Sequence, residues 1–346
     1  MPKIAFFDTK QYDRVSFDTA NQTYGFGLTY FPYHLSQASA SMAAGHNAIC
    51  AFVNDVVDAT VIQTLLKNGV RLIALRCAGY NNIDLKAAYG NIHVARVPAY
   101  SPHAVAEHAV ALMLTLNRKT HRAYSRIREG NFSIAGLEGF DMFGKTAGVI
   151  GTGKIGRCLV DILNGFGMDV LLYDPYPNQD YAEAKRARYV SLEDLYRLAD
   201  IISLHCPLTP QTMHMINEAS IRMMKDSVMI INTGRGKLIK TSDLIDALKT
   251  GKVGSAGLDV YEEESDYFFE DFSSAVIGDD VLARLLTFPN VLVTPHQGFL
   301  TNEALHNIAE TTLANIKDFF SGGGLKNEIC YHCDKDCRKK QGGLCF

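Results

Sequence analysis

The chain has 346 residues, a length that suggests two domains at roughly 150 residues each. Apolar residues make up 47% and charged residues 21%, and 34 Lys and Arg stand against 37 Asp and Glu for a formal charge of −3. This composition excludes a fibre and disfavours disorder, and the balanced charge predicts no nucleic-acid or anionic-membrane partner, so a small-molecule partner is expected.

The amino-terminal residues predict no export. The apolar run Ile4–Phe7 ends at Asp8 and is too short for a secretory signal. No uncharged apolar stretch approaches the roughly 20 residues that cross a bilayer. Eight cysteines, several of them inside apolar runs, fit reduced thiols better than a disulfide framework. We therefore expect a soluble cytoplasmic protein with no membrane contact.

Short apolar runs alternate with segments of helical periodicity, which predicts an α/β fold built on parallel sheets. In the first hundred residues this pattern predicts one small sheet. Its five strands are expected at Lys3–Asp8, Leu28–Phe31, Ala48–Val53, Leu72–Arg76 and His93–Val97.

A long helix is predicted to begin at Ser101-Pro102, because Ser suits the N-cap and Pro the first helical position. The apolar residues that follow have helical spacing up to about Leu116. This helix separates two halves of different character, so it is the predicted crossover between domains.

Six strands beyond Thr146 predict a second, doubly wound sheet. They are expected at Ala147–Ile150, Val170–Tyr173, Asp200–His205, Val228–Asn232, Ser255–Val260 and Val291–Thr294. Ser191–Asp194 resembles a capping box, and Thr241-Ser242 with Gly251 brackets another helix. A last helix is expected from Asn302 to Phe320, before the glycines 322–324 and a polar tail.

The motif Gly151-x-Gly153-x-x-Gly156 directly follows a predicted strand and opens a predicted helix. In that context the glycines allow a tight turn, the approach of a diphosphate and close packing of helix on strand. Asp174 ends the next strand, eighteen residues after Gly156, where a carboxylate would accept hydrogen bonds from a ribose. Because this acid also repels a 2′-phosphate and no Arg follows it closely, the sequence favours NAD over NADP.

Three residues that follow predicted strands are candidates for catalysis. Arg235 stands between glycines and suits a carboxylate, although a surface Arg in a turn has the same pattern. His296 is the candidate acid and base, but His205 also ends a strand. Glu264 would raise the imidazole pKa and orient the ring if it contacts His296. The alternative is a solvated acidic run, in which Glu262, Glu263 and Asp266 mostly face water.

Together, the glycine motif with Asp174, the Arg235 loop, the segment 259–264 and Thr294-Pro-His296-Gln resemble the NAD-dependent D-isomer-specific 2-hydroxyacid dehydrogenases from Met1 to about Cys330. Tyr261–Asp271 and Pro289–Phe299 are most similar to the members that interconvert pyruvate and D-lactate. The resemblance implies two doubly wound parallel-sheet domains with a cleft between them. Residues 1–100 and 299–346 would form a flavodoxin-like substrate domain, and 101–298 a Rossmann NAD domain.

The resemblance also implies site residues. The catalytic set would be Arg235, Glu264 and His296. Cofactor contacts would extend from the three glycines and Asp174 to Ile155, Cys206, Pro207, Thr233, Gly234 and Asp259. The amides of Cys77, Ala78 and Gly79 would hold the substrate carboxylate, and Phe52, Tyr100 and Phe299 would line a pocket that favours a methyl group. Some lactate enzymes carry Tyr at the position of Phe52, and the three rings could instead belong to the core.

Several alternatives stay open. The thiols Cys330, Cys333, Cys337 and Cys345, with His332 among them, could bind zinc, but their spacing in a short basic tail favours reduced thiols, so no metal is predicted. The function could instead be that of a dehydrogenase for a bulkier D-2-hydroxy acid or an NAD-gated interaction protein of the corepressor type. Relatives commonly pair through the NAD domain, which predicts a homodimer or higher oligomer through the region 103–145.

Overall fold

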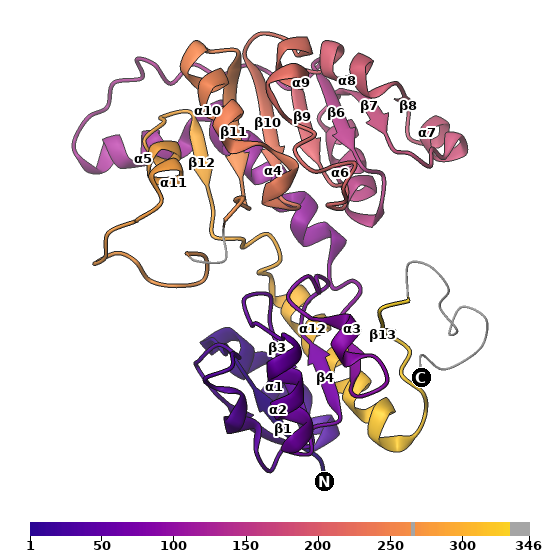
Figure 1. The fold of residues 1–346 in the computed structure, drawn as a ribbon. Helices are drawn as coiled ribbons and strands as arrows, with labels where there is room; N and C mark the ends of the chain where they lie inside the picture. The colour runs from indigo at the N-terminus through magenta and orange to yellow at the C-terminus, as the bar shows by residue number, and fades with distance from the viewer. Residues whose placement is uncertain (264–266, 333–346) are drawn as a thin grey trace. The chain divides into compact units, whose positions relative to one another are not determined.

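The computed structural model describes residues 1–263 and 267–332. They divide into two compact units. The first comprises Met1–Ser101 and the described part of Leu300–Phe346, and the second is Pro102–Phe299. Each unit is a mainly parallel sheet with helices on both faces, so the prediction of two parallel-sheet α/β domains is confirmed (Figure 1). No helix of the described residues is long and apolar enough to span a membrane.

The first unit holds a six-stranded sheet with the order β13-β5-β4-β3-β1-β2. Its strands are β1 (Lys3–Phe6), β2 (Gly27–Tyr30), β3 (Ala48–Ala51), β4 (Leu72–Leu75), β5 (His93–Ala95) and β13 (Glu328–Ile329). All neighbours are parallel except β13, which runs antiparallel to β5. Without β13 the order is 2-1-3-4-5, the flavodoxin-like arrangement.

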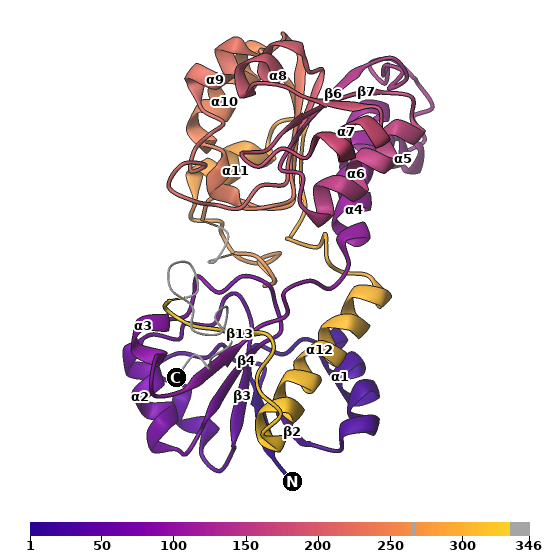
Figure 2. The same cartoon turned by 90° about the vertical axis from the view of Figure 1, so that its right-hand side faces the viewer.

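Helices cover both faces of this sheet. They are α1 (Gln11–Tyr24), the 3₁₀ helix η1 (Ala40–Ala43), α2 (Ala59–Lys67), α3 (Leu85–Ala88) and α12 (Asn302–Ser321). Figure 2 shows α2 and α3 on one face and the packed pair α1 and α12 on the other. Because both faces are covered, β3 and β4 are buried along their whole length, which explains their continuous apolar sequences.

The second unit holds a seven-stranded parallel sheet with the order β12-β11-β10-β9-β6-β7-β8. Its strands are β6 (Thr146–Ile150), β7 (Asp169–Tyr173), β8 (Ala187–Tyr189), β9 (Ile201–Leu204), β10 (Val228–Asn232), β11 (Val253–Leu258) and β12 (Val291–Val293). The strand order reverses between β6 and β9. Such a switch point is where open α/β sheets bind ligands.

Several helices accompany the sheet of the second unit, and all of those described except α5 bury apolar residues. They are α4 (Pro102–Arg118), α5 (Thr120–Arg128), α6 (Lys154–Gly165), α7 (Gln179–Ala184), α8 (Leu192–Leu198), α9 (Glu218–Met223), the 3₁₀ helix η2 (Gly236–Leu238), α10 (Thr241–Thr250) and α11 (Asp280–Leu286). Met113 of α4 and Leu159 of α6 are buried on one face, and Leu195 of α8 and Leu244 of α10 on the other. The switch point is therefore supported from both sides.

The eleven predicted strands are all present, but the structure adds two that the sequence analysis missed. β8 is a three-residue edge strand whose middle residue, Arg188, is exposed, and β13 has only two residues, so neither contains an apolar run. The predicted first strand also extended too far, because Asp8 has a φ of 48° and cannot continue a strand.

The predicted helix boundaries are confirmed. Helix α4 begins at Pro102, and the Ser191 hydroxyl accepts a hydrogen bond from the Asp194 amide at the start of α8. Gly251 and Gly322 end α10 and α12 with φ values of 77° and 72°. A left-handed residue after the last turn is the common way to end a helix.

Candidate active site

One edge of the second unit gathers most of the predicted site. Because its seven strands are parallel, the loops that follow their carboxyl ends lie along the same edge. Those loops carry Gly151 and Gly153 after β6, Asp174 after β7, Cys206 and Pro207 after β9, Thr233, Gly234 and Arg235 after β10, Asp259 after β11 and His296 after β12, while Ile155 and Gly156 lie in the first turn of α6. Residues distant in sequence thus come from adjacent strands.

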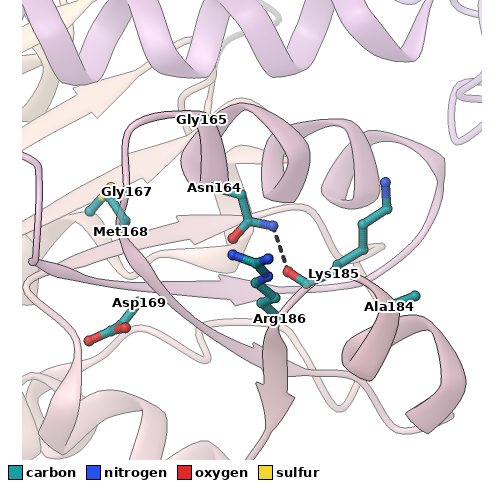
Figure 3. A pocket seen from close by; sticks show the side chains of 8 residues that line it. All are labelled: Asn164, Gly165, Gly167, Met168, Asp169, Ala184, Lys185 and Arg186. Atoms are coloured by element: carbon teal, nitrogen blue, oxygen red, sulfur yellow. Dashed lines mark hydrogen bonds between the residues drawn. The ribbon is translucent and has the colours of Figure 1, made fainter.

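A shallow pocket of about 540 Å³ lies at the opposite edge (Figure 3). It is bordered by the end of α6, the start of β7 and the segment 184–186. The side-chain amide of Asn164 donates a hydrogen bond to the Lys185 carbonyl at 2.7 Å. Asp169 at the pocket begins β7, whereas Asp174 follows the end of that strand. The pocket is therefore separate from the edge that carries the predicted site.

The three motif glycines have different surroundings. A Cβ on Gly151, whose φ is 97°, would lie 2.6 Å from the carbonyl carbon of His205, and one on Gly156 would lie 2.0 Å from the Gly151 oxygen. A Cβ on Gly153 would meet nothing within 4 Å. The first and third glycines thus allow close packing, and the second leaves open space before the first turn of α6. Helix amino termini bind phosphate groups in this way.

Asp174 is held as an ionised acceptor beside this turn. Its Oδ2 accepts hydrogen bonds from the Thr152 amide at 2.8 Å and the Thr152 hydroxyl at 3.0 Å, and its Oδ1 accepts from the Tyr176 amide at 3.0 Å. Partial burial opposes ionisation, but these bonds hold the pKa of Asp174 below its ordinary value. A charged carboxylate there suits ribose hydroxyls and repels a 2′-phosphate.

The sequence analysis looked for an Arg only after Asp174 and so missed Arg157. This residue of α6 donates from Nε to the Thr152 carbonyl at 3.0 Å, and its guanidinium lies 4.6 Å from the centre of the Tyr181 ring. Its charge also lowers the pKa of Asp174. The sequence signal that could have identified Arg157 is its position in α6, one helical turn after Gly153.

Thr233 gives an independent indication of a ligand. The residue is 7% exposed, and its buried hydroxyl oxygen has no hydrogen-bond partner within the described protein. A buried polar atom without a partner is costly, so such atoms usually face a ligand or water. With the open space at Gly153 and the carboxylate of Asp174, the residues at this edge fit a dinucleotide.

Asp259 organises the loop that carries His296. The residue is 1% exposed and accepts hydrogen bonds from the Thr294 hydroxyl at 2.6 Å and from the amides of Gln297 at 2.9 Å and Gly298 at 2.8 Å. The His108 ring lies 3.1 Å from its Oδ1. Although burial opposes ionisation, these contacts lower the pKa of Asp259. The loop is thereby fixed on both sides of His296. No local pattern pointed to His108 on α4.

The Arg235 loop is also closed by local hydrogen bonds. The Asn232 side chain donates to the Arg235 carbonyl at 2.9 Å and accepts from the Gly234 amide at 3.0 Å. A Cβ on Gly236 would lie 1.9 Å from the Tyr261 carbonyl oxygen, so this loop packs directly on the segment after β11. Arg235 is therefore presented by an ordered loop that packs on the segment after β11.

Glu264 lies outside the described residues, but described residues before and after it contact the Arg235 loop and His296. Before it, the Tyr261 carbonyl packs against Gly236, next to Arg235. After it, the Phe269 ring lies 5.8 Å, centre to centre, from the His296 ring. Tyr261 thus lies against the Arg235 loop, and Phe269 lies against His296.

His205, the competing histidine, does not suit the role of acid. Its Nε2 lies 2.8 Å from the Ser203 hydroxyl, and removal of the ring from water lowers its pKa to about 4. The ring is consequently neutral near pH 7, so it is not in the imidazolium form that a general acid requires. This observation favours His296.

The pocket residues predicted in the first unit follow β3, β4 and β5. Phe52 is 7% exposed, with the Arg76 guanidinium 4.7 Å from its ring centre. In the predicted carboxylate-binding loop 77–79, the Ala78 carbonyl accepts a hydrogen bond from the Arg96 guanidinium, and the Cys77 thiol donates one to the Gly79 carbonyl. The Tyr100 carbonyl accepts from Asn307.

The remaining predictions concern Phe299 and the cysteines of the carboxyl-terminal tail. Phe299, in the second unit, is 8% exposed. Of the four tail cysteines, Cys330 is buried, and Cys333, Cys337 and Cys345 lie outside the described residues, so the prediction of reduced thiols stays a prediction.

Comparison with known proteins identifies what this arrangement resembles. Residues 110–298 match the family described as D-isomer specific 2-hydroxyacid dehydrogenase, NAD binding domain. The D-lactate dehydrogenase of Escherichia coli is 52% identical over 328 residues, which cover 94% of this chain and 99% of that protein. The apo structure of the E. coli enzyme has a TM-score of 0.88 at 50% identity, with the same two coverages. A Chlamydomonas reinhardtii pyruvate reductase structure has a TM-score of 0.90 at 45% identity, covering 94% and 98%.

Proposed function

Because the chain belongs to the D-isomer specific 2-hydroxyacid dehydrogenases, and is thus an NAD-dependent enzyme, we propose that it interconverts pyruvate and D-lactate. The observation that carries this proposal is that Tyr261 packs against the Arg235 loop while Phe269 lies against the His296 ring. The names of the relatives, D-lactate dehydrogenase and pyruvate reductase, support the choice of substrate.

Each member of the catalytic set has one role in pyruvate reduction. Arg235 binds the substrate carboxylate through its planar guanidinium. Bound NADH supplies the hydride that is added to the keto carbon. Protonated His296 donates its proton to the carbonyl oxygen as negative charge develops there, and Glu264 favours the protonated ring and orients it. Oxidation of D-lactate uses the same groups, with neutral His296 as the base.

The cofactor would be held along the carboxyl edge of the seven-stranded sheet. The amino terminus of α6 and the open turn at Gly153 receive the diphosphate, and Asp174 accepts from the ribose hydroxyls. The buried Thr233 hydroxyl would find its missing partner in the cofactor. The remaining contacts are assigned to Gly151, Ile155, Gly156, Cys206, Pro207, Gly234 and Asp259.

The substrate side chain is assigned to the rings of Phe52, Tyr100 and Phe299, and the carboxylate also to the amides of Cys77, Ala78 and Gly79. Bulky rings favour a methyl group, so we expect kcat/KM to be highest for pyruvate and to fall at least about 10-fold for phenylpyruvate and 2-ketoisocaproate. Steady-state NADH oxidation with these acids and 2-ketobutyrate measures the order. A preference for the larger acids would instead indicate a dehydrogenase for bulkier substrates, and no turnover of any acid would favour the corepressor-type alternative.

A homodimer formed through the second unit is also part of the proposal. Helix α5 buries none of its residues, and Tyr124 and Ile127 on it are 63% and 54% exposed. Phe132, Ile134 and Phe143 in the following loop are 75%, 81% and 79% exposed. So large an apolar area on one segment is typical of an interface. With a second copy as its partner, the protein would be a cytoplasmic dimer.

The double substitution Phe132→Asp and Ile134→Asp is expected to convert the dimer to a monomer, because it places two charges in an apolar interface. Sedimentation equilibrium measures the mass. Val276→Asp is the matched control, since Val276 is 91% exposed but lies outside this segment. A monomeric wild-type protein, or a double variant that stays dimeric, would contradict this interface.

A further inference from the structure

Glu262 makes a specific set of contacts two residues before Glu264. Its side chain is only 19% exposed. One carboxylate oxygen lies 2.7 Å from Nε2 of His214, and the other accepts a hydrogen bond from the Thr241 amide at 2.7 Å. The alternative of a solvated acidic run therefore does not hold for Glu262, because both of its oxygens are bound by groups from other parts of the second unit.

His214 connects the same site to the Arg235 loop. Its amide donates to the Lys237 carbonyl at 2.8 Å, and the chain after it pairs with the end of that loop through a bridge between Ile216 and Ile239. His214 has a φ of 53°, a conformation that costs free energy in a non-glycine residue and persists only where surrounding contacts impose it. In this backbone conformation the residue contacts the loop with its backbone and Glu262 with its ring.

The neighbouring Glu263 shows that these contacts are selective. It pairs with Lys237 at 3.4 Å, but the two side chains are 61% and 45% exposed. A surface pair of this kind contributes little to structure, because water screens the charges and both side chains keep their freedom. Adjacent acids on one segment thus have different roles: Glu262 is anchored and Glu263 is solvated.

We propose that Glu262 and His214 are positioning residues of the dehydrogenase reaction, which fix the start of the segment after β11, at Tyr261 and Glu262, against the loop that carries Arg235. The inference rests on the proposed function. Both carboxylate oxygens of Glu262 are bound by groups outside its own segment, which restrains the backbone that follows β11. On the other side of the contact, the packing of Gly236 against Tyr261 transmits the same restraint to the turn that presents Arg235.

The test compares Glu262→Ala with Glu263→Ala in the full-length enzyme. Displacement of a catalytic group by about 1 Å costs on the order of 100-fold, so Glu262→Ala is expected to lower kcat for pyruvate reduction about 10- to 100-fold and to raise the KM for pyruvate. Its Kd for NADH, measured by titration calorimetry, should stay within about twofold of wild type. Glu263→Ala should change neither constant by more than about twofold.

Two further variants separate positioning from general damage. Glu262→Gln keeps an acceptor for the Thr241 amide and a polar atom toward His214, so it should recover most of the lost kcat. His214→Asn tolerates the left-handed backbone but is too short to reach Glu262, and it should reproduce the Glu262→Ala defect. The double variant Glu262→Ala with His214→Asn should be no worse than either single variant, because the two substitutions remove the same contact, the one between His214 and Glu262.

Three results would overturn the inference while leaving the proposed function intact: a Glu262→Ala enzyme as active as Glu263→Ala, a kcat that Glu262→Gln does not recover, or losses in the double variant that simply multiply. Failure of the proposed function is distinguishable from these, because the wild-type enzyme itself would then not oxidise NADH in the presence of pyruvate.

Discussion

His296→Ala is expected to lower kcat/KM for pyruvate by about 100- to 10,000-fold, the usual contribution of a positioned general acid. The loss follows because the developing oxyanion then receives no proton from the protein. Binding of NADH should change little, since the residues proposed to hold the diphosphate and the ribose follow β6 and β7. Stopped-flow measurement of NADH oxidation gives the rate, and titration calorimetry gives the NADH affinity.

The matched control is His205→Asn. Burial keeps His205 neutral near pH 7, so this substitution should cost far less activity than His296→Ala. A His296→Ala enzyme that retains turnover, with His205→Asn inactive, would move the proton transfer to His205 and contradict the assignment made here.

Arg76→Met is expected to lower the free energy of unfolding by about 3–5 kcal/mol. Arg76 is 1% exposed and donates to the carbonyl oxygens of Phe7 and Asp8 and to the carboxylate of Asp13, which is itself 5% exposed. Removing the cation leaves a buried carboxylate without its counter-charge. Urea denaturation followed by circular dichroism measures the change.

Arg71→Met is the matched control for stability. Arg71 directly precedes β4 and Arg76 directly follows it, but Arg71 is exposed. Its replacement should lower the free energy of unfolding by at most about 0.5 kcal/mol. Replacing both partners, with Arg76→Met and Asp13→Leu together, should restore part of the loss, since the buried carboxylate of Asp13 is then no longer left without its partner. Equal effects of Arg76→Met and Arg71→Met would show that the buried pair does not stabilise the first unit.

The parts of the fold that were predictable from sequence are those with a local signal. A strand covered on both faces must be apolar throughout, as β3 and β4 are, and helix ends need particular residues, such as Pro102 and Gly251. β13 could not be predicted, because two residues have no periodicity and pair with β5 only after a helix has returned the chain.

The same distinction applies to the site. The glycine motif and Asp174 are predictable because their chemistry depends on fixed spacing within one strand, helix and strand. The contacts of Asp259 with His108 and of Glu262 with His214 join residues from different elements, and only the tertiary fold brings them together. The acidic run 262–264 shows the consequence: composition alone suggested a solvated stretch, whereas Glu262 is anchored.

Chiral analysis of the lactate formed from pyruvate and NADH tests the central claim most directly. With wild-type enzyme we expect D-lactate alone, in an amount equal to the NADH oxidised. Formation of L-lactate, or loss of NADH without lactate, would contradict the assignment of Arg235, Glu264 and His296 to this reaction.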